Sequence, residues 1–276
     1  MKKKIGIMGW GEIGRSVARL YPKSKYQILS KDLNHDYLRG ERIDILHVAI
    51  PYSDDFIKDI IKQIKKNQPK FVIIESTVDV GVTSKINKKL SKTSTGVERK
   101  KKIVVHSPVR GMHPNLTKSL KCFVKYIGAD NRNIGERAVK HYQSIGVKSK
   151  LFMPSESTEL NKILSTSYYG ICIAWAAEIK RLCDKYKIDY KSFEDFNNSY
   201  NEGYIKMGRK NVIRPTLYPP KSGIGGHCVY ENAQMFNPRV KSKFLDLILN
   251  AGKDKSAKTL KLKHSTHKAS NVKKEK

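Results

Sequence analysis

The sequence has 276 residues, which is enough for one or two domains with a buried core. Its 55 lysines and arginines exceed its 25 aspartates and glutamates and give a formal net charge of +30. The basic residues are scattered and no helix-turn-helix, zinc-finger or RNA-recognition signature is present, so we predict no nucleic-acid partner. The charge excess is either compositional bias or a field that attracts an anionic substrate. No apolar run approaches the roughly 18 residues of a membrane span, which predicts a cytoplasmic protein without a membrane partner.

A glycine motif follows the first expected strand, residues 4–8, and precedes the helical pattern that begins near residue 13. Its spacing is G-x-G-x-x-G, in the strand-turn-helix setting that dinucleotide binding requires. The first glycine of this motif permits a tight turn, the second lets a pyrophosphate lie against the backbone, and the third allows helix and strand to pack closely. We therefore predict that cofactor contacts come from Gly9, Trp10, Gly11, Glu12, Ile13 and Gly14.

The acidic residue Asp32 follows the second strand, residues 26–30. It is placed to bind the adenosine ribose hydroxyls, which favours NAD over NADP. Ser30 and Lys31 could instead accept a 2′-phosphate, and Asp32 could be an ordinary turn residue at the end of a strand.

Further buried strands are expected over residues 44–51, 71–81, 102–106, 123–127 and 147–152, with an amphipathic helix over 56–64. Together they predict a Rossmann-type, doubly wound parallel sheet in residues 1–153, with α-helices on its faces. Ser76 and Thr77 stand at the carboxyl end of a strand, where the ligands of such sheets bind. Arg110 and His113 lie in a Gly/Pro-containing loop and predict contacts to a substrate anion or hydroxyl, unless they only stabilise that loop.

A smaller all-α domain is expected over residues 154–250, built on one long helix from about residue 155 to 187. Such a helix often forms a dimer interface, so a homodimer is the expected assembly. Glu159, Lys162 and Thr166 share one face of this helix and form either a polar site or a solvated stripe. Short helices are expected over 190–201, 233–236 and 244–249. The lysine-rich tail, 251–276, should be disordered.

Three glycines precede His227 and Cys228 in the stretch 222–228, so the backbone can approach a bound ligand closely at Gly225 and Gly226. A cysteine thiolate is a strong nucleophile, and a neighbouring cation or helix N-terminus favours that form. The alternative is a turn with an inert structural cysteine. No spacing of the chain's cysteines matches a disulfide framework or a metal site, and we predict neither. The four are Cys122, Cys172, Cys183 and Cys228.

Several motifs occur together in one order, and in this combination the sequence resembles the UDP-glucose/GDP-mannose dehydrogenase family, especially its UDP-N-acetylmannosamine dehydrogenase-like branch. The matches are the glycine motif at 9–14, Glu75-Ser76-Thr77-Val78-x-x-Gly81, Glu159-Leu160-x-Lys162, Ala177-Glu178-Ile179, and Gly223-Ile224-Gly225-Gly226-His227-Cys228.

The resemblance implies an oxidoreductase that converts the primary alcohol of a sugar nucleotide to the acid with two NAD. It implies that Cys228 traps the aldehyde covalently, that Lys162 stabilises the developing oxyanion, and that Thr77 is held near the catalytic water.

The sequence also departs from this family. Thr166 replaces an asparagine, Asn232 replaces an aspartate and cannot act as a base, and residues 107–113 replace an acidic stretch. We also expect the family's C-terminal nucleotide-sugar-binding domain to be absent. Two alternatives therefore stay open. One is a single-step enzyme that resembles 6-phosphogluconate and β-hydroxyacid dehydrogenases and uses Lys162 as acid and base. The other is a dinucleotide-binding protein without catalytic activity.

Overall fold

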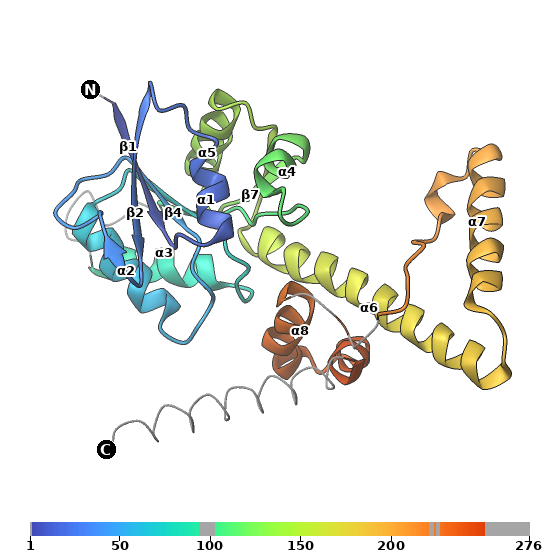
Figure 1. The fold of residues 1–276 in the computed structure, drawn as a ribbon. Coiled ribbons are helices and arrows are strands. Elements are labelled where there is room, and N and C mark those ends of the chain that lie inside the picture. Colours follow the sequence, from blue (N-terminus) through green and yellow to red (C-terminus); the bar gives the residue numbers. More distant parts are fainter. Residues whose placement is uncertain (1, 94–102, 221–223, 225–226, 252–276) are drawn as a thin grey trace, which may run out of the picture. The chain divides into compact units, whose positions relative to one another are not determined.

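The computed structural model describes residues 2–93, 103–220, 224 and 227–251, and the expected disordered tail lies outside these residues apart from its first position. The chain divides into two compact units, Met1–Lys162 and Ile163–Lys276 (Figure 1). The expected domain boundary after residue 153 precedes the long helix, whereas in the structure the first two turns of that helix belong to the first unit. Each unit is described separately below.

The first unit contains an eight-stranded sheet in the order β3-β2-β1-β4-β5-β6-β7-β8. All neighbouring strands are parallel except the pairs β2–β3 and β6–β7, so the expected doubly wound sheet is confirmed with two antiparallel pairs. The reversal of strand order beside β1 creates the crevice in which such sheets bind ligands. The strands are β1 Lys3–Met8, β2 Tyr26–Asp32, β3 His35–Asp36, β4 Ile45–Val48, β5 Phe71–Ile74, β6 Val104–His106, β7 Lys125–Gly128 and β8 Ser149–Phe152.

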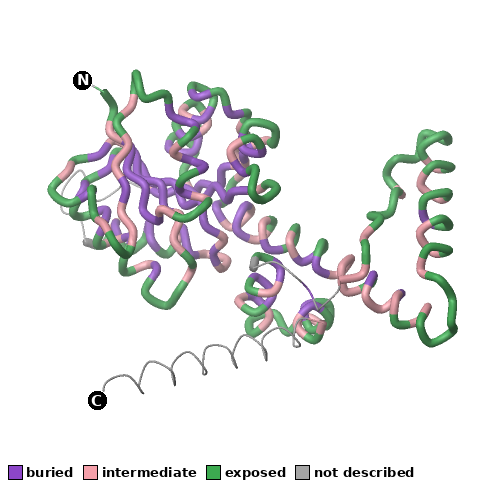
Figure 2. Tube along the Cα trace, viewed as in Figure 1, coloured by how far each residue is buried: buried purple, intermediate pink, exposed green. Residues whose placement is uncertain are grey.

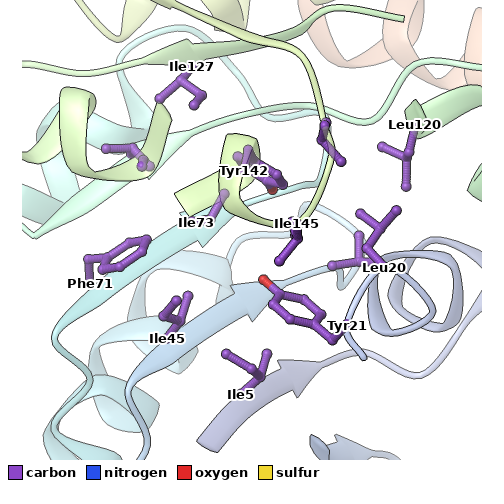
Figure 3. Packing of buried hydrophobic residues seen from close by; sticks show 14 of the residues in the cluster. Ile5, Leu20, Tyr21, Ile45, Phe71, Ile73, Leu120, Ile127, Tyr142 and Ile145 are labelled. Atoms are coloured by element: carbon purple, nitrogen blue, oxygen red, sulfur yellow. The ribbon is translucent and has the colours of Figure 1, made fainter. Parts of the chain in front are cut away.

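Helices cover both faces of this sheet, because successive strand residues point to opposite faces and both sets are apolar. Ile5, Ile45 and Ile73 belong to one buried cluster, and Leu46 and Val72 belong to the other. Figure 2 shows the burial concentrated on the strands, and Figure 3 shows part of the first cluster with the rings of Tyr21 and Tyr142. Helices α1 Glu12–Ala18, α4 Leu116–Cys122 and α5 Arg132–Ser144 pack on the first cluster, and α2 Phe56–Asn67 and α3 Val82–Thr93 pack on the second.

The long helix α6, Glu156–Tyr186, begins in the first unit and ends one residue before the expected position. Its first turn packs against β7 so closely that a Cβ on Gly128 would lie 2.1 Å from Thr158 Oγ1. Lys187 follows the helix and adopts a left-handed φ of 56°. Helices commonly end at a residue in this conformation.

The second unit consists of the rest of α6, together with α7 Tyr190–Lys206, the short 3-10 helix η2 Lys210–Val212, α8 His227–Val240 and a further helical segment over 243–251. The short helix expected over 233–236 is the middle of α8. Gly170 lets the helices of this unit approach, because a Cβ there would lie 2.5 Å from Val229 Cγ1 and 2.9 Å from Ile248 Cδ1. Among the described helices, none is both long and apolar enough to cross a membrane.

Candidate functional site

A cavity of about 840 Å³ opens in the first unit beside the glycine motif. Five of the residues predicted to bind a cofactor line it, and they are Gly9, Gly11, Glu12, Ile13 and Asp32. The other four, Trp10, Gly14, Ser76 and Thr77, are not part of its described lining. The carboxyl ends of β1 and β4 meet at this cavity, as the strand order requires.

The three glycines of the motif have three different surroundings. Gly9 adopts a left-handed φ of +98°, and a Cβ there would lie 2.5 Å from the Ala49 carbonyl oxygen. At Gly14 a Cβ would lie only 1.9 Å from the Gly9 carbonyl oxygen. At Gly11, by contrast, no atom lies within 4 Å of the Cβ position, so its side faces open space in the cavity. The first and third glycines therefore serve packing, and the second leaves room for a ligand.

The Asp32 carboxylate is fixed at the cavity wall by two backbone amides. Trp10 N donates to Oδ2 and Leu33 N donates to Oδ1, both at 2.8 Å. The residues that could have accepted a 2′-phosphate have other partners: Lys31 Nζ pairs with Asp36 Oδ2 at 2.8 Å, and the Ser30 hydroxyl lies 2.9 Å from His35 Nε2. Each carboxylate oxygen keeps a lone pair for a ribose hydroxyl.

Ser76 and Thr77 follow β5 but have different environments. The Ser76 hydroxyl is buried and donates to the Ile50 carbonyl oxygen at 2.6 Å, which ties the end of β5 to the end of β4. Thr77 is half-buried, and its hydroxyl makes no hydrogen bond within the described part of the chain. Of the two, Thr77 has the side chain that is available to a substrate or a water.

A buried histidine that the sequence analysis did not single out lies beside these residues. His106 Nε2 donates to the Ser76 carbonyl oxygen at 3.1 Å, and Nδ1 lies 2.8 Å from Thr158 Oγ1. Burial lowers the pKa of His106 to about 3, and the positive charges of Lys125 and Lys162 add to this effect. Lys162 itself is half-buried, and its charge acts on His106 at the end of β6.

Glu159, which the sequence placed in the substrate-binding cluster, is bonded to backbone and side-chain groups of the same unit. Its side chain is fully buried, and its oxygens accept three hydrogen bonds, from Gly81 N at 2.6 Å, Thr83 N at 2.8 Å and Thr83 Oγ1 at 2.7 Å. Burial raises the pKa of this carboxyl, while the hydrogen bonds oppose the rise. Glu159 thus supports the first turn of α3 and anchors α6 to the sheet.

Arg110 and His113 have different partners, although they share a loop. Arg110 Nη2 donates to the Val124 carbonyl oxygen at 2.8 Å, and its guanidinium lies 4.7 Å from the Tyr126 ring centre. These contacts favour the loop-stabilising reading for Arg110. His113 is exposed, its Nδ1 lies 2.6 Å from Glu12 Oε2, and it lines the cavity beside the glycine motif.

The buried Glu75, which precedes Ser76, is the centre of a polar network that sequence reasoning missed. Its carboxylate contacts Lys125 Nζ at 2.5 Å, His47 Nδ1 at 2.7 Å and the Tyr142 hydroxyl. Burial alone would raise the pKa of Glu75, but the Lys125 charge and His47 outweigh it and lower the pKa to about 2. The partners come from β4, β7 and α5, so the network holds the end of β5 in place.

The second unit contains the remaining predicted catalytic residues. Cys228 is exposed and stands in the first turn of α8 rather than in a loop. Asn232, one turn further along, is buried, and its Nδ2 donates to Thr166 Oγ1 at 2.9 Å. Thr166 Oγ1 in turn donates to the Ile163 carbonyl oxygen at 2.9 Å. Gly225, Gly226 and the His227 side chain lie outside the described residues.

No family model matches the sequence. Among relatives, UDP-N-acetyl-D-mannosamine dehydrogenase of Pyrococcus horikoshii is 22% identical over 286 aligned positions, which cover 87% of this chain and 65% of that protein. Further proteins of that name match at 24% to 30% identity. The relatives of this chain are therefore UDP-N-acetylmannosamine dehydrogenases, as the motifs indicated, and the chain spans less than two thirds of their length.

Solved structures show the same fold. UDP-D-ManNAc dehydrogenase from Pyrococcus horikoshii superposes with a TM-score of 0.72 at 18% identity and covers 97% of this chain and 72% of that one. 3-Hydroxyisobutyrate dehydrogenase of Mycobacterium tuberculosis superposes with a TM-score of 0.64 at 12% identity and covers 91% and 92% of the two chains.

Proposed function

We propose that this chain is an NAD-dependent dehydrogenase that oxidises the primary alcohol of a sugar nucleotide or a similar sugar-like substrate. The observation that carries the proposal is the cavity at the carboxyl end of β1, where Gly11 leaves open space and Asp32 is fixed at the wall. The relatives named above, which are dehydrogenases of UDP-N-acetyl-D-mannosamine, support this substrate class.

The cavity residues fit NAD. The open side of Gly11 accommodates a pyrophosphate next to the backbone, and the Asp32 carboxylate accepts hydrogen bonds from the adenosine ribose hydroxyls. A 2′-phosphate at this place would be repelled by the carboxylate, so we expect NAD to bind better than NADP. Lys62 and Lys66 also line the cavity, which makes NADP the second cofactor to measure.

Lys162 and Thr77 are the residues of the first unit that we assign to the substrate. When bound, NAD accepts the hydride that leaves the carbinol carbon in each oxidation. The Lys162 ammonium stabilises negative charge on the substrate oxygen as its proton leaves. The Thr77 hydroxyl, which has no partner within the described residues, can orient the substrate or a water.

Cys228 is the proposed nucleophile of the second oxidation. Its exposed thiolate adds to the aldehyde carbon and forms a thiohemiacetal, and loss of a second hydride gives a thioester. Water then cleaves the thioester to the acid and returns the thiolate. The neighbouring Thr166 and Asn232 are neutral and cannot take the proton from that water, so this last step is expected to be slow.

The test is NADH formation with NAD and a panel of UDP- and GDP-sugars, with the NADH produced counted per substrate consumed. A ratio near two that falls to one in Cys228→Ser supports the covalent route. Unchanged acid formation in Cys228→Ser contradicts it. Lys162→Met should abolish turnover under either outcome, because both routes need the cation.

A single-step dehydrogenase is the second candidate, and the similarity of the fold to 3-hydroxyisobutyrate dehydrogenase over nearly the full length of both chains favours it. In that case Lys162 acts as the general acid and base, one NADH is produced per substrate consumed, and the Cys228→Ser variant keeps its activity. A chain that binds NAD in calorimetry but forms no NADH with any substrate would instead have only a binding role.

A homodimer is the proposed assembly. Large apolar side chains of α6 and α7 are exposed in the single chain, and a second copy that covers them would remove this surface from water. They include Tyr168, Trp175 and Phe196. Light scattering of the purified chain measures the mass directly.

A further inference from the structure

A second cavity, of about 420 Å³, lies in the first unit where α1 ends and α4 begins. It is lined by Arg19, Pro114, Asn115, Thr117, Lys118 and Lys121. None of these residues lines the cavity beside the glycine motif, although Pro114 directly follows His113, which does. The described lining thus combines three cations with an amide and a hydroxyl and contains no carboxylate.

The three cations of this cavity have no acidic partner within the described part of the chain. Arg19, Lys118 and Lys121 form none of the ion pairs of the first unit, whereas Lys4, Lys31 and Lys125 each contact a carboxylate. Like charges that share one cavity repel one another. An anion bound between them would relieve this repulsion and would gain charge-assisted hydrogen bonds.

The hydroxyl of Thr117 is not counted among the groups open to a ligand, because Thr117 Oγ1 is buried from solvent. The Asn115 side chain makes no capping bond to α4 and stays available.

We propose that this cavity is a binding site for a phosphate group, either free phosphate or the phosphate of a small phosphorylated metabolite. A phosphate dianion offers several acceptor oxygens in a tetrahedral arrangement, and it can accept hydrogen bonds from a guanidinium, two ammonium groups and the Asn115 amide at once. A carboxylate has only two oxygens and a single charge and would leave part of this set unused. The site does not depend on the proposed dehydrogenase activity.

Calorimetric titration of the full chain with inorganic phosphate tests the site. Arg19→Ala and Lys121→Ala should each weaken phosphate binding about tenfold or more, because each removes a charge-assisted hydrogen bond. Lys140→Ala is the matched control, since Lys140 is an exposed lysine of α5 outside the cavity and its loss lowers the net charge equally.

The proposal is overturned if phosphate does not saturate the protein, if the cavity variants bind it as well as the unchanged chain, or if Lys140→Ala weakens binding to the same extent. The last result would mean that the net charge alone gathers anions. Arg19 and Lys121 are exposed, so thermal melting should show that Arg19→Ala and Lys121→Ala are folded. Arg19→Gln and Lys121→Gln are a second pair of variants that remove the same two charges. A parallel titration with glycerol 3-phosphate identifies the source: tighter binding than phosphate indicates a phosphorylated metabolite, and equal or weaker binding indicates phosphate itself.

Discussion

Asn232 Nδ2 donates a hydrogen bond to Thr166 Oγ1 at 2.9 Å, so two of the positions that the sequence analysis singled out as departures from the family it resembles contact each other. The substitutions are therefore linked in space, although 66 positions separate them in the chain. The bond joins a neutral amide to a neutral hydroxyl, and the amide of Asn232 lies one helical turn after Cys228. The pair stabilises the packing of α8 on α6 but provides no proton acceptor.

Asn232→Asp should speed acid release, because a carboxylate one turn from Cys228 can accept the proton of an attacking water. General base catalysis contributes typically about 10²–10⁴-fold, so a gain of about tenfold or more is expected even with imperfect geometry. Quenched-flow measurement of acid formation checks this. Asn232→Ala is the control, since it removes the amide without adding a base. Equal rates in the two variants would contradict the assignment.

Gly14→Ala should lower the stability of the fold, whereas Gly11→Ala should weaken NAD binding. The Gly14 methyl group would collide with the Gly9 carbonyl oxygen at 1.9 Å, so that variant should lose about 1–3 kcal/mol of unfolding free energy or more. The Gly11 methyl group would enter open space, so that variant should melt normally but bind NAD at least about tenfold more weakly. Urea unfolding and NAD titration separate the two effects. Normal NAD binding by Gly11→Ala would argue against a pyrophosphate at this place.

Asp32→Ser should shift the cofactor preference toward NADP. The substitution removes the negative charge that repels a 2′-phosphate, while Lys62 and Lys66 stay in the cavity lining. We expect the ratio of NADP to NAD affinity to rise about tenfold or more, the equivalent of about 1.4 kcal/mol. Fluorescence titration with both cofactors measures the ratio. Asp59→Ser, which alters another acid of the same lining, is the control and should change the ratio less.

The protein should lose stability in two stages as the pH falls. Burial keeps His106 and His141 neutral by lowering the pKa of each from 6.5 to about 3. The unfolded chain binds these protons first, so each histidine lowers the unfolding free energy by about 1.4 kcal/mol per pH unit as the pH falls from 6.5 to 3. The pKa of Glu75 is lowered from 4.5 to about 2, so this carboxylate further lowers the unfolding free energy as the pH falls between those two values.

Urea unfolding at a series of pH values measures these slopes. His106→Asn, which cannot take up a proton, should show a shallower slope than the unchanged protein between pH 6.5 and 3. The exposed His113→Asn is the matched control and should keep the original slope. If both variants follow the unchanged protein, the buried histidine does not cause the acid sensitivity.

The sequence by itself determined the features that depend on neighbouring residues. The glycine spacing at 9–14 and the acid at 32 belong to one strand-helix-strand segment of the chain, so the cavity that we propose for NAD could be predicted from local chemistry. The alternating apolar faces of the strands and the apolar helical spacing of residues 156–186 likewise predicted the sheet and the long helix. These patterns reflect backbone geometry and burial, which are written into a short stretch of chain.

Only the tertiary structure decided the roles that depend on distant partners. Glu159 looked like part of a substrate cluster by helical spacing, but the fold buries its carboxylate and bonds it to Gly81 and Thr83. Glu75 meets Lys125 across 50 positions, and Asn232 meets Thr166 across 66. A carboxylate or an amide can serve binding, catalysis or support with equal ease. Its role is set by which groups desolvate it and which bond to it, and chain folding alone brings those groups together.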